Sequence, residues 1–232
     1  MIDIHCHILP GIDDGALDTE TSIAMARIAV NDGIHTIIAT PHLTSATSSK
    51  KKLLEAVAQL NTTLKHHKVP LTILFGAEVQ AHIAVSVADY FCLAESSFLL
   101  VEFPHSYLPV DARELITALT SRSITPIIAH PERNIQIGRE PWQLTTLLEV
   151  GAKIQITAES ITGKMGITAK NCAEYLLQNG QVHYLATDSH APGFREPILS
   201  KAVKLAARII GEEQAKQLVM ATGILSPLPS CL

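Results

Sequence analysis

Residues 125–133 read TPIIAHPER, a short run of apolar and β-branched residues that ends in a histidine. Six other segments carry similar runs: IDIHCH (2–7), HTIIATPH (35–42), LTILFGAE (71–78), FLLVEFP (98–104), KIQITAES (153–160) and VHYLATDSH (182–190). Short apolar runs of this kind are typical of strands that are buried on both faces. The sequence therefore predicts seven strands.

Amphipathic stretches lie between these segments, at about 18–33, 50–66, 109–121, 140–150, 166–179 and 196–221. In the first of them, Asp18 or Thr19 can cap the start of a helix and Gly33 can end it. Strands that alternate with helices predict an α/β protein with a parallel sheet. Seven strands favour a closed or nearly closed barrel, although an open doubly wound sheet gives the same alternation.

The size and composition of the chain favour a single domain that spans residues 1–232. Of the 232 residues, 47% are hydrophobic and only 17% are charged, and the mean hydropathy is +0.24. No apolar run reaches the roughly 18–20 residues that cross a bilayer, and the N-terminus lacks the pattern of a signal peptide. We therefore expect a cytoplasmic protein without membrane insertion.

The cysteines and the net charge restrict the class further. Cys6, Cys92, Cys172 and Cys231 are scattered without a C-x-x-C pair, which favours reduced thiols over a disulfide framework. The net charge is -4 and no basic stripe is present, so nucleic acid is excluded as a partner.

Nearly every predicted strand ends in an ionisable residue, and the set is His5, His7, His42, Glu78, Glu102, His130, Asp188 and His190. A single histidine after a strand is more often structural. Here the residues repeat at the carboxyl ends of strands, where the loops of a barrel converge. Burying Glu102 or Asp188 among apolar neighbours costs several kcal/mol unless a cation or hydrogen-bond donors compensate. Because the imidazoles and carboxylates exceed the needs of one ion, the sequence predicts a multinuclear metal site.

Two arginines follow the histidines on the same loops. Arg133 comes three residues after His130, and Arg195 comes five residues after His190. A guanidinium can bind a tetrahedral phosphate through two parallel hydrogen bonds, although each arginine alone is as easily a surface residue. Together with the metal ligands, the pair predicts a phosphate site.

The combined motifs MIDIHCHILPGIDDGA, TIIATPH, GAEV, VEFP, PIIAHPERN, QIT and ATDSHAPGFR resemble a known family, over residues 1 to about 210. They are similar to the bacterial manganese-dependent protein-tyrosine phosphatases of capsule and exopolysaccharide operons, in the polymerase-and-histidinol-phosphatase (PHP) superfamily. The resemblance implies a single-domain, distorted (β/α)7 barrel of TIM type. It also implies three divalent metal ions, with Mn²⁺ favoured and Fe or Zn as alternatives.

Position by position, the resemblance assigns His5, His7, Glu78 and Asp188 to the first ion. Glu78 would bridge to a second ion bound by Glu102 and His130, and the third would take Asp14, His42 and His190. Arg133 and Arg195 match the family's phosphate-contacting arginines. The role of Asp13 stays open. Its side chain could orient a metal ligand or fix the turn of the DDG segment, and we favour the turn.

The resulting hypothesis is hydrolysis of phosphotyrosine in a protein by a hydroxide that bridges two metal ions. The partner implied is a phosphotyrosine protein, in particular a bacterial tyrosine kinase of polysaccharide export.

Thiol chemistry is excluded because none of the four cysteines has an arginine six positions later. His105 and Tyr107 are candidates for a general acid, although polarity of the loop and packing explain them better. His35, His66, His67, His82 and His183 are interpreted as structural or solvated.

Three alternatives stay open at this point. A PHP-type phosphatase of a small metabolite such as histidinol phosphate is disfavoured by DDG and VEFP. A metal-dependent amide hydrolase would leave both arginines without a purpose. A non-enzymatic, metal-stabilised binding module would show no hydrolysis with any divalent metal.

Overall fold

The structure is a computed structural model that describes residues 1–43 and 49–225. The Ser/Thr-rich residues 44–48 and the end of the chain, which includes Cys231, lie outside the described residues. The described part has eight parallel strands, in the orders β1-β2-β3 and β4-β5-β6-β7-β8. They are β1 (Ile2–Cys6), β2 (Thr36–Ala39), β3 (Thr72–Phe75), β4 (Glu78–Gln80), β5 (Phe98–Glu102), β6 (Thr125–Ala129), β7 (Lys153–Thr157) and β8 (Tyr184–Ala186).

Strands β3 and β4 are separated only by Gly76 and Ala77, so one predicted segment supplies both. At this break the chain changes its partner, since β3 pairs with β2 and β4 pairs with β5. A Cβ on Gly76 would lie 2.8 Å from side-chain atoms of Ile38 and Leu93, which leaves room for glycine alone. The eight strands therefore occupy seven places round the barrel.

Two seams close the barrel at its mouth. Between β8 and β1, Asp188 N donates to His5 O at 2.8 Å and His7 N donates to Ser189 O at 2.9 Å. Between β2 and β4, Leu43 N donates to Glu78 O at 3.0 Å. The predicted distorted (β/α)7 barrel is confirmed, and both seams run through residues that were predicted as metal ligands.

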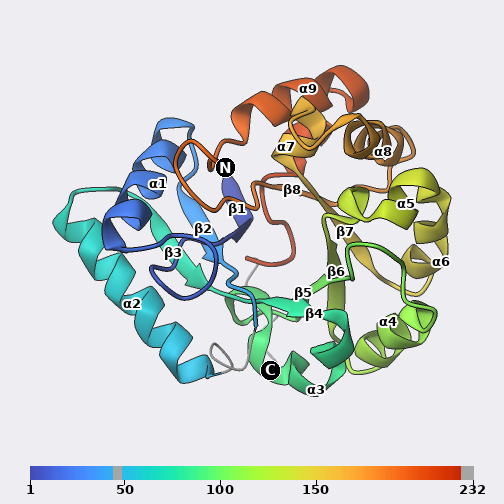
Figure 1. Cartoon of the computed structure of the whole chain (residues 1–232), viewed down its shortest axis with the longest axis horizontal. Helices are drawn as coiled ribbons and strands as arrows, with labels where there is room; N and C mark the ends of the chain where they lie inside the picture. The colour runs from blue at the N-terminus through green and yellow to red at the C-terminus, as the bar shows by residue number, and fades with distance from the viewer. Residues whose placement is uncertain (44–48, 226–232) are drawn as a thin grey trace, which may run out of the picture.

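Helices surround the strands (Figure 1). They are α1 (Thr19–Asn31), α2 (Lys50–His66), α3 (Ala81–Phe91), α4 (Ala112–Thr120), α5 (Ile135–Arg139), α6 (Thr145–Leu148), α7 (Ala158–Thr162), α8 (Ile167–Gln178), α9 (Ser200–Ile210) and α10 (Glu212–Gln217), with 3-10 turns at Leu93–Glu95, Pro131–Arg133 and Pro141–Leu144. Asp18 is the N-cap of α1, because its side chain accepts from Thr21 N.

Several helix predictions need correction. The predicted helix 196–221 is two helices, since Gly211 has φ 88° and interrupts it. The predicted helix 140–150 is a 3-10 turn followed by the short α6. Helices α3, α5 and α7 were not predicted, and α3 follows β4 directly with neither a loop nor a capping side chain to mark its start. No helix in the described ranges is long and apolar enough to cross a membrane.

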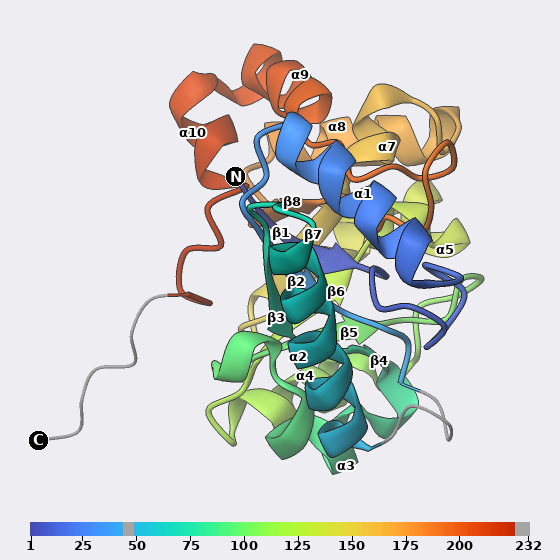
Figure 2. The ribbon, with the colours of Figure 1, turned by 90° about the vertical axis from the view of Figure 1, so that its left-hand side faces the viewer.

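Apolar side chains fill the inside of the barrel towards the N-terminal ends of the strands. Alternate residues of the strands, such as Leu100, Ile127 and Ala186, form a cluster separate from the core between strands and helices. Residues 218–225 close this end: Ile224 joins the cluster, and Tyr184 Oη donates to the carbonyl of Thr222 at 3.0 Å. In Figure 2 this red segment lies on the opposite side of the barrel from the dark blue loop that follows β1.

Candidate metal centre

Glu78, at the start of β4, lies at the centre of the polar cluster at the mouth. Its side chain is 1% exposed. Oε2 is 3.0 Å from His42 Nδ1, 3.3 Å from His5 Nε2 and 3.5 Å from His7 Nε2. Oε1 is 2.9 Å from His130 Nε2. One buried carboxylate therefore contacts imidazoles that come from three different strand ends and lie far apart in sequence.

Asp188 lies on the other side of the same histidines. Its Oδ1 is 3.2 Å from His7 Nε2 and 3.3 Å from His5 Nε2. Its Oδ2 accepts hydrogen bonds from both Arg133 and Arg195. The two predicted phosphate-binding arginines thus converge on one oxygen at the edge of the histidine cluster.

The remaining predicted ligands lie beside histidines of the same cluster. Asp14 Oδ1 lies 3.6 Å from His42 Nε2 and 3.6 Å from His190 Nε2. Glu102 places Oε2 3.8 Å from His42 Nδ1 and Oε1 4.0 Å from His130 Nε2. The fold therefore brings all nine predicted ligands into one cluster. Four groups within it have ligand atoms close enough to share an ion: His7/Asp14/His42/His190, His5/His130/Asp188, His5/His7/Glu78 and His42/Glu78/Glu102.

Asp13 has both of the roles considered for it. Its Oδ1 accepts from Gly15 N at 3.0 Å, which fixes the turn as favoured from the sequence. Its Oδ2 also lies 2.6 Å from His7 Nδ1 and accepts from His42 N at 2.9 Å. The contact to Nδ1 leaves Nε2 of His7 for a metal. A Cβ on Gly15 would lie 2.1 Å from His7 O, so the glycine of DDG is required for this arrangement.

Gln155 is a site residue that the sequence reasoning did not assign. It lies in β7, is fully buried, and places Oε1 2.9 Å from His5 Nδ1. Like Asp13 on His7, this contact fixes which nitrogen of His5 faces the cluster. The available signal was a polar residue between Ile154 and Ile156 in an otherwise apolar strand.

The pKa values show how strongly these groups act on one another. Burial opposes a charge on His7, but the neighbouring carboxylates of Asp13 and Glu78 raise its pKa to about 9. Burial also opposes the charge on Glu78, yet the neighbouring histidines hold its pKa well below the ordinary value. His190 shifts the other way, because burial and the charge of His7 lower its pKa to about 4. Burial and the nearby Arg133 lower the pKa of Arg195 to about 10.

Three residues of the cluster have a backbone in the left-handed region. The φ angles are 32° for His130, 52° for Asp188 and 53° for Arg195. Such angles cost about 1–3 kcal/mol for a residue other than glycine and persist where surrounding structure imposes them, often at functional sites. His130 and Asp188 have this conformation just after β6 and β8 end, and Arg195 has it on the loop that follows β8.

The donor atoms of the cluster fit divalent metal ions. Oε2 of Glu78 is buried and has no hydrogen-bond partner among the described residues, although three imidazole nitrogens surround it. A buried acceptor without a donor is costly, and a bound cation would compensate it. Mixed imidazole and carboxylate ligands suit Mn, Fe or Zn better than Ca.

The family model described as capsular polysaccharide synthesis, CpsB/CapC, matches residues 1–224. The chain belongs to the CpsB/CapC family. It is 38% identical to the tyrosine-protein phosphatase YwqE of Bacillus subtilis over 219 residues, which cover 92% of this chain and 86% of YwqE. It is 28% identical to the tyrosine-protein phosphatase CpsB of Streptococcus pneumoniae over 232 residues, with 94% of each chain covered.

Solved structures support the same assignment. A crystal structure from a study of YwqE and CpsB, described as unique metal-dependent tyrosine phosphatases, superposes with a TM-score of 0.89 at 37% identity. It covers 94% of this CpsB/CapC chain and 91% of the solved one. A TatD-family hydrolase of Entamoeba histolytica matches with a TM-score of 0.53 at 12% identity over 94% and 95% of the two chains, which shows the barrel fold alone.

Five further histidines of this CpsB/CapC chain are not part of the centre, although His82 lines a cavity that Glu102 also lines. Within the described ranges, none of His35, His66, His67, His82 and His183 belongs to a metal-ligating group. Nδ1 of His183 accepts from Ile154 N at 3.3 Å, and its pKa is lowered to about 4 by burial and by Lys153. The structural interpretation of His183 therefore agrees with its contacts.

Proposed function

We propose that this chain hydrolyses phosphotyrosine at the barrel mouth, with Arg133 and Arg195 binding the phosphate beside a cluster of three metal ions. As a member of the CpsB/CapC family, the chain is a metal-dependent tyrosine phosphatase of capsular polysaccharide synthesis, which acts on phosphotyrosine proteins. The observation that supports the proposed site is the convergence of both guanidinium groups on Asp188, next to the histidine cluster.

The proposed ligand sets are His5, His7, Glu78 and Asp188 for one ion, Glu78, Glu102 and His130 for the second, and Asp14, His42 and His190 for the third. The short distances support part of this division, since His5, His7 and Glu78 form one close group and Asp14, His42 and His190 lie together in another. The other close groups cross the division, because His130 lies with His5 and Asp188, and His42 also lies with Glu78 and Glu102. We favour Mn²⁺ because of the number of carboxylates. Bound ions would activate the attacking water and neutralise charge on the phosphoryl oxygens.

The chain's own residues position the substrate. The forked guanidinium groups of Arg133 and Arg195 would bind two phosphate oxygens and stabilise the charge that develops on them. In doing so they would leave Asp188 Oδ2, which they now contact, free to bind metal. Asp13 and Gln155 hold the rings of His7 and His5 with Nε2 towards the cluster.

For the biological substrate we propose a phosphotyrosine segment of a bacterial tyrosine kinase of polysaccharide export. The proposed location is the cytoplasm, because the scattered cysteines are typical of a reducing compartment. We treat residues 1–232 as the single domain that carries this function.

The test combines elemental analysis with kinetics. Purified protein should contain three Mn, Fe or Zn ions per chain, and chelation should abolish hydrolysis of a phosphotyrosine peptide until Mn²⁺ is restored. Comparable rates on a phosphoserine peptide would remove the preference for tyrosine, and inertness with every divalent metal would support a binding module.

The variant Arg195→Ala tests the role of the arginine in phosphate binding separately from the role of the metal ligands. We expect unchanged metal content and a loss of about 100-fold in kcat/KM, as for removal of one group that stabilises a transition-state oxygen. His42→Ala should instead lower the metal content. Full kcat/KM in Arg195→Ala would contradict the assigned role.

A further inference from the structure

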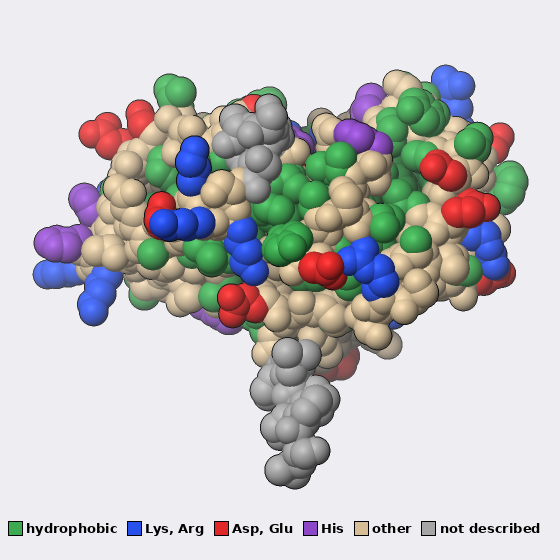
Figure 3. Space-filling model, turned by 90° about the horizontal axis from the view of Figure 1, so that it is seen from below, with side chains coloured by type: hydrophobic (Ala, Val, Ile, Leu, Met, Phe, Trp, Pro, Cys, Tyr) green, Lys and Arg blue, Asp and Glu red, His purple; other side chains and the backbone are tan. Residues whose placement is uncertain are grey.

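A cavity of about 680 Å³ opens beside the metal centre. Its volume lies within the range of roughly 300–1,000 Å³ that is usual for small-molecule sites. Most of the apolar part of the wall comes from the segment after β5 and from α4: Phe103, Pro104, Tyr107, Pro109, Val110 and Leu115. The face in Figure 3 also has hydrophobic side chains exposed between charged ones, with histidines at its upper edge.

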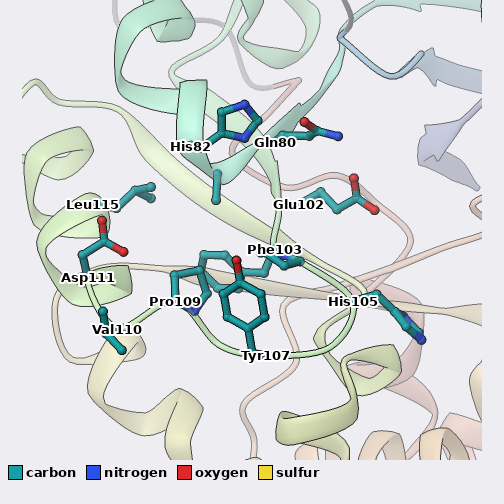
Figure 4. Close-up of a pocket in the computed structure, with 12 residues that line it drawn as sticks. Gln80, His82, Glu102, Phe103, His105, Tyr107, Pro109, Val110, Asp111 and Leu115 are labelled. Atoms are coloured by element: carbon teal, nitrogen blue, oxygen red, sulfur yellow. The ribbon is translucent and has the colours of Figure 1, made fainter.

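Glu102 belongs both to the cavity wall and to the metal-ligating cluster. Its carboxylate reaches towards His42 and His130, while the same side chain borders the cavity. Figure 4 shows Glu102 and His105 at one end, the ring of Tyr107 near Phe103 and Pro109, and Val110 and Leu115 at the other end. A phosphate bound at the cluster would therefore lie beside this cavity, because Glu102 borders both.

The cavity wall is held in place by the segment that carries a phosphate-binding arginine. Asn134, which follows Arg133, donates from Nδ2 to the carbonyls of Pro104 and Tyr107 at 2.6 and 2.9 Å. Ile135 N donates to His105 O at 2.9 Å, and Leu108 N donates to Gln136 Oε1 at 3.0 Å. The apolar wall and the phosphate site are thus fixed relative to each other before a substrate binds.

We infer that the end of this cavity next to Glu102 binds the phenyl ring of phosphotyrosine and so selects aryl over alkyl phosphates. This inference rests on the proposed function, since it assumes that the phosphate binds at the metal cluster. Tyr107 is the main contact, because it is 55% exposed and its ring faces the cavity, where an aromatic ring can pack against it. A phosphoserine side chain has no ring and would leave this surface wet.

The first test measures binding by calorimetry, with metal-loaded protein and two non-hydrolysable probes, phenylphosphonate and methylphosphonate. We expect the wild-type chain to prefer phenylphosphonate by at least about ten-fold, and Tyr107→Ala to reduce that preference about three- to ten-fold. The variant should fold and bind metal, because the hydrogen bond at this position uses the main-chain carbonyl of Tyr107.

Two control variants identify the group responsible. Tyr107→Phe keeps the ring and should keep the preference, so an equal loss in this variant would assign the effect to the hydroxyl and overturn the inference. Tyr90→Ala removes a tyrosine of similar exposure, 60%, at the far end of α3 and outside the cavity. It should leave both affinities unchanged. An unchanged ratio in Tyr107→Ala would also overturn the inference.

Kinetics then distinguish the ring from neighbouring residues of the substrate. If the ring is bound, Tyr107→Ala raises KM for free phosphotyrosine and for a phosphotyrosine peptide alike. A loss confined to the peptide would mean that the cavity binds a flanking side chain instead, which contradicts the inference. Failure of the proposed function looks different, since the wild-type chain would then hydrolyse neither substrate.

Discussion

The two ends of the barrel interior are built from the same strands but from opposite chemistry. On β5, Leu100 and Glu102 lie on one face, two residues apart, and Leu100 joins the apolar cluster while Glu102 reaches the histidines at the mouth. Ala186, the last residue of β8, and Asp188, two residues beyond it, repeat the same change from apolar to charged. A step of two residues along the chain therefore separates an apolar layer that stabilises the fold from the layer of candidate metal ligands at the mouth.

This difference shows which end of the barrel interior stabilises the fold and which end lowers its stability. The closed end buries a cluster of mainly apolar side chains beneath residues 218–225, which is favourable without any ligand. The mouth gathers imidazoles and carboxylates at distances where they shift one another's pKa, and it holds three backbone positions in the left-handed region. Such an arrangement is costly on its own and is explained by the ions that it can bind.

The largest expected effect comes from Glu102→Gln, at the mouth. The amide keeps the shape of the side chain but removes the charge that the second proposed ion needs. Hydrolysis of a phosphotyrosine peptide should fall more than about 1,000-fold. Elemental analysis should show fewer ions per chain, and retention of all three ions with full activity would exclude Glu102 as a ligand.

Leu100→Ala tests the other layer of the same strand. Removing this fully buried side chain should lower the free energy of unfolding by about 2–5 kcal/mol, because a cavity is left in the apolar cluster. Activity per folded molecule should change by less than about three-fold. Urea denaturation measures the free energy of unfolding, and kinetics measure the activity. A large loss of activity with unchanged stability would contradict the conclusion that the apolar end serves stability and the mouth serves activity.

Asp13→Asn probes how the mouth orients its ligands. The side-chain amide would present a donor to His7 Nδ1, which favours the tautomer that protonates Nε2 instead of leaving it free. Metal affinity should fall about 10- to 100-fold, the usual effect of removing a group that orients a ligand. Titration with Mn²⁺ measures this, and an unchanged affinity would leave Asp13 with the turn alone.

The smallest effect is expected at the closed end, from His183. Its pKa of about 4 in the folded protein lies below the ordinary value of 6.5, so the unfolded chain binds the proton more readily between these two pH values. Stability should therefore fall by about 1–2 kcal/mol on acidification from pH 7 to pH 5. His183→Gln should remove this part of the pH dependence in urea denaturation.

Much of the candidate site could be predicted because its residues follow strands directly. The apolar runs predicted the strand ends, and the ionisable residues after them predicted eight of the nine candidate ligands and the two arginines. Asp14 was assigned only by the family resemblance. Residues that act through a contact across the barrel were harder. Gln155 reaches His5 over 150 positions in sequence, and only the pairing of strands brings the two together. Asp13 was assigned to its turn, since local spacing carries no information about His7 Nδ1.

The sequence by itself determined the alternation of strands and helices, because buried parallel strands require continuous apolar runs and the loops between them do not. It also determined which side chains could bind metal and phosphate. Only the tertiary structure decided that β3 and β4 share one place in the barrel, that two seams close it through His5, Glu78 and Asp188, and that a cavity opens beside Glu102. These features depend on contacts between segments far apart in the chain, where close packing and hydrogen-bond geometry select one arrangement that local composition does not encode.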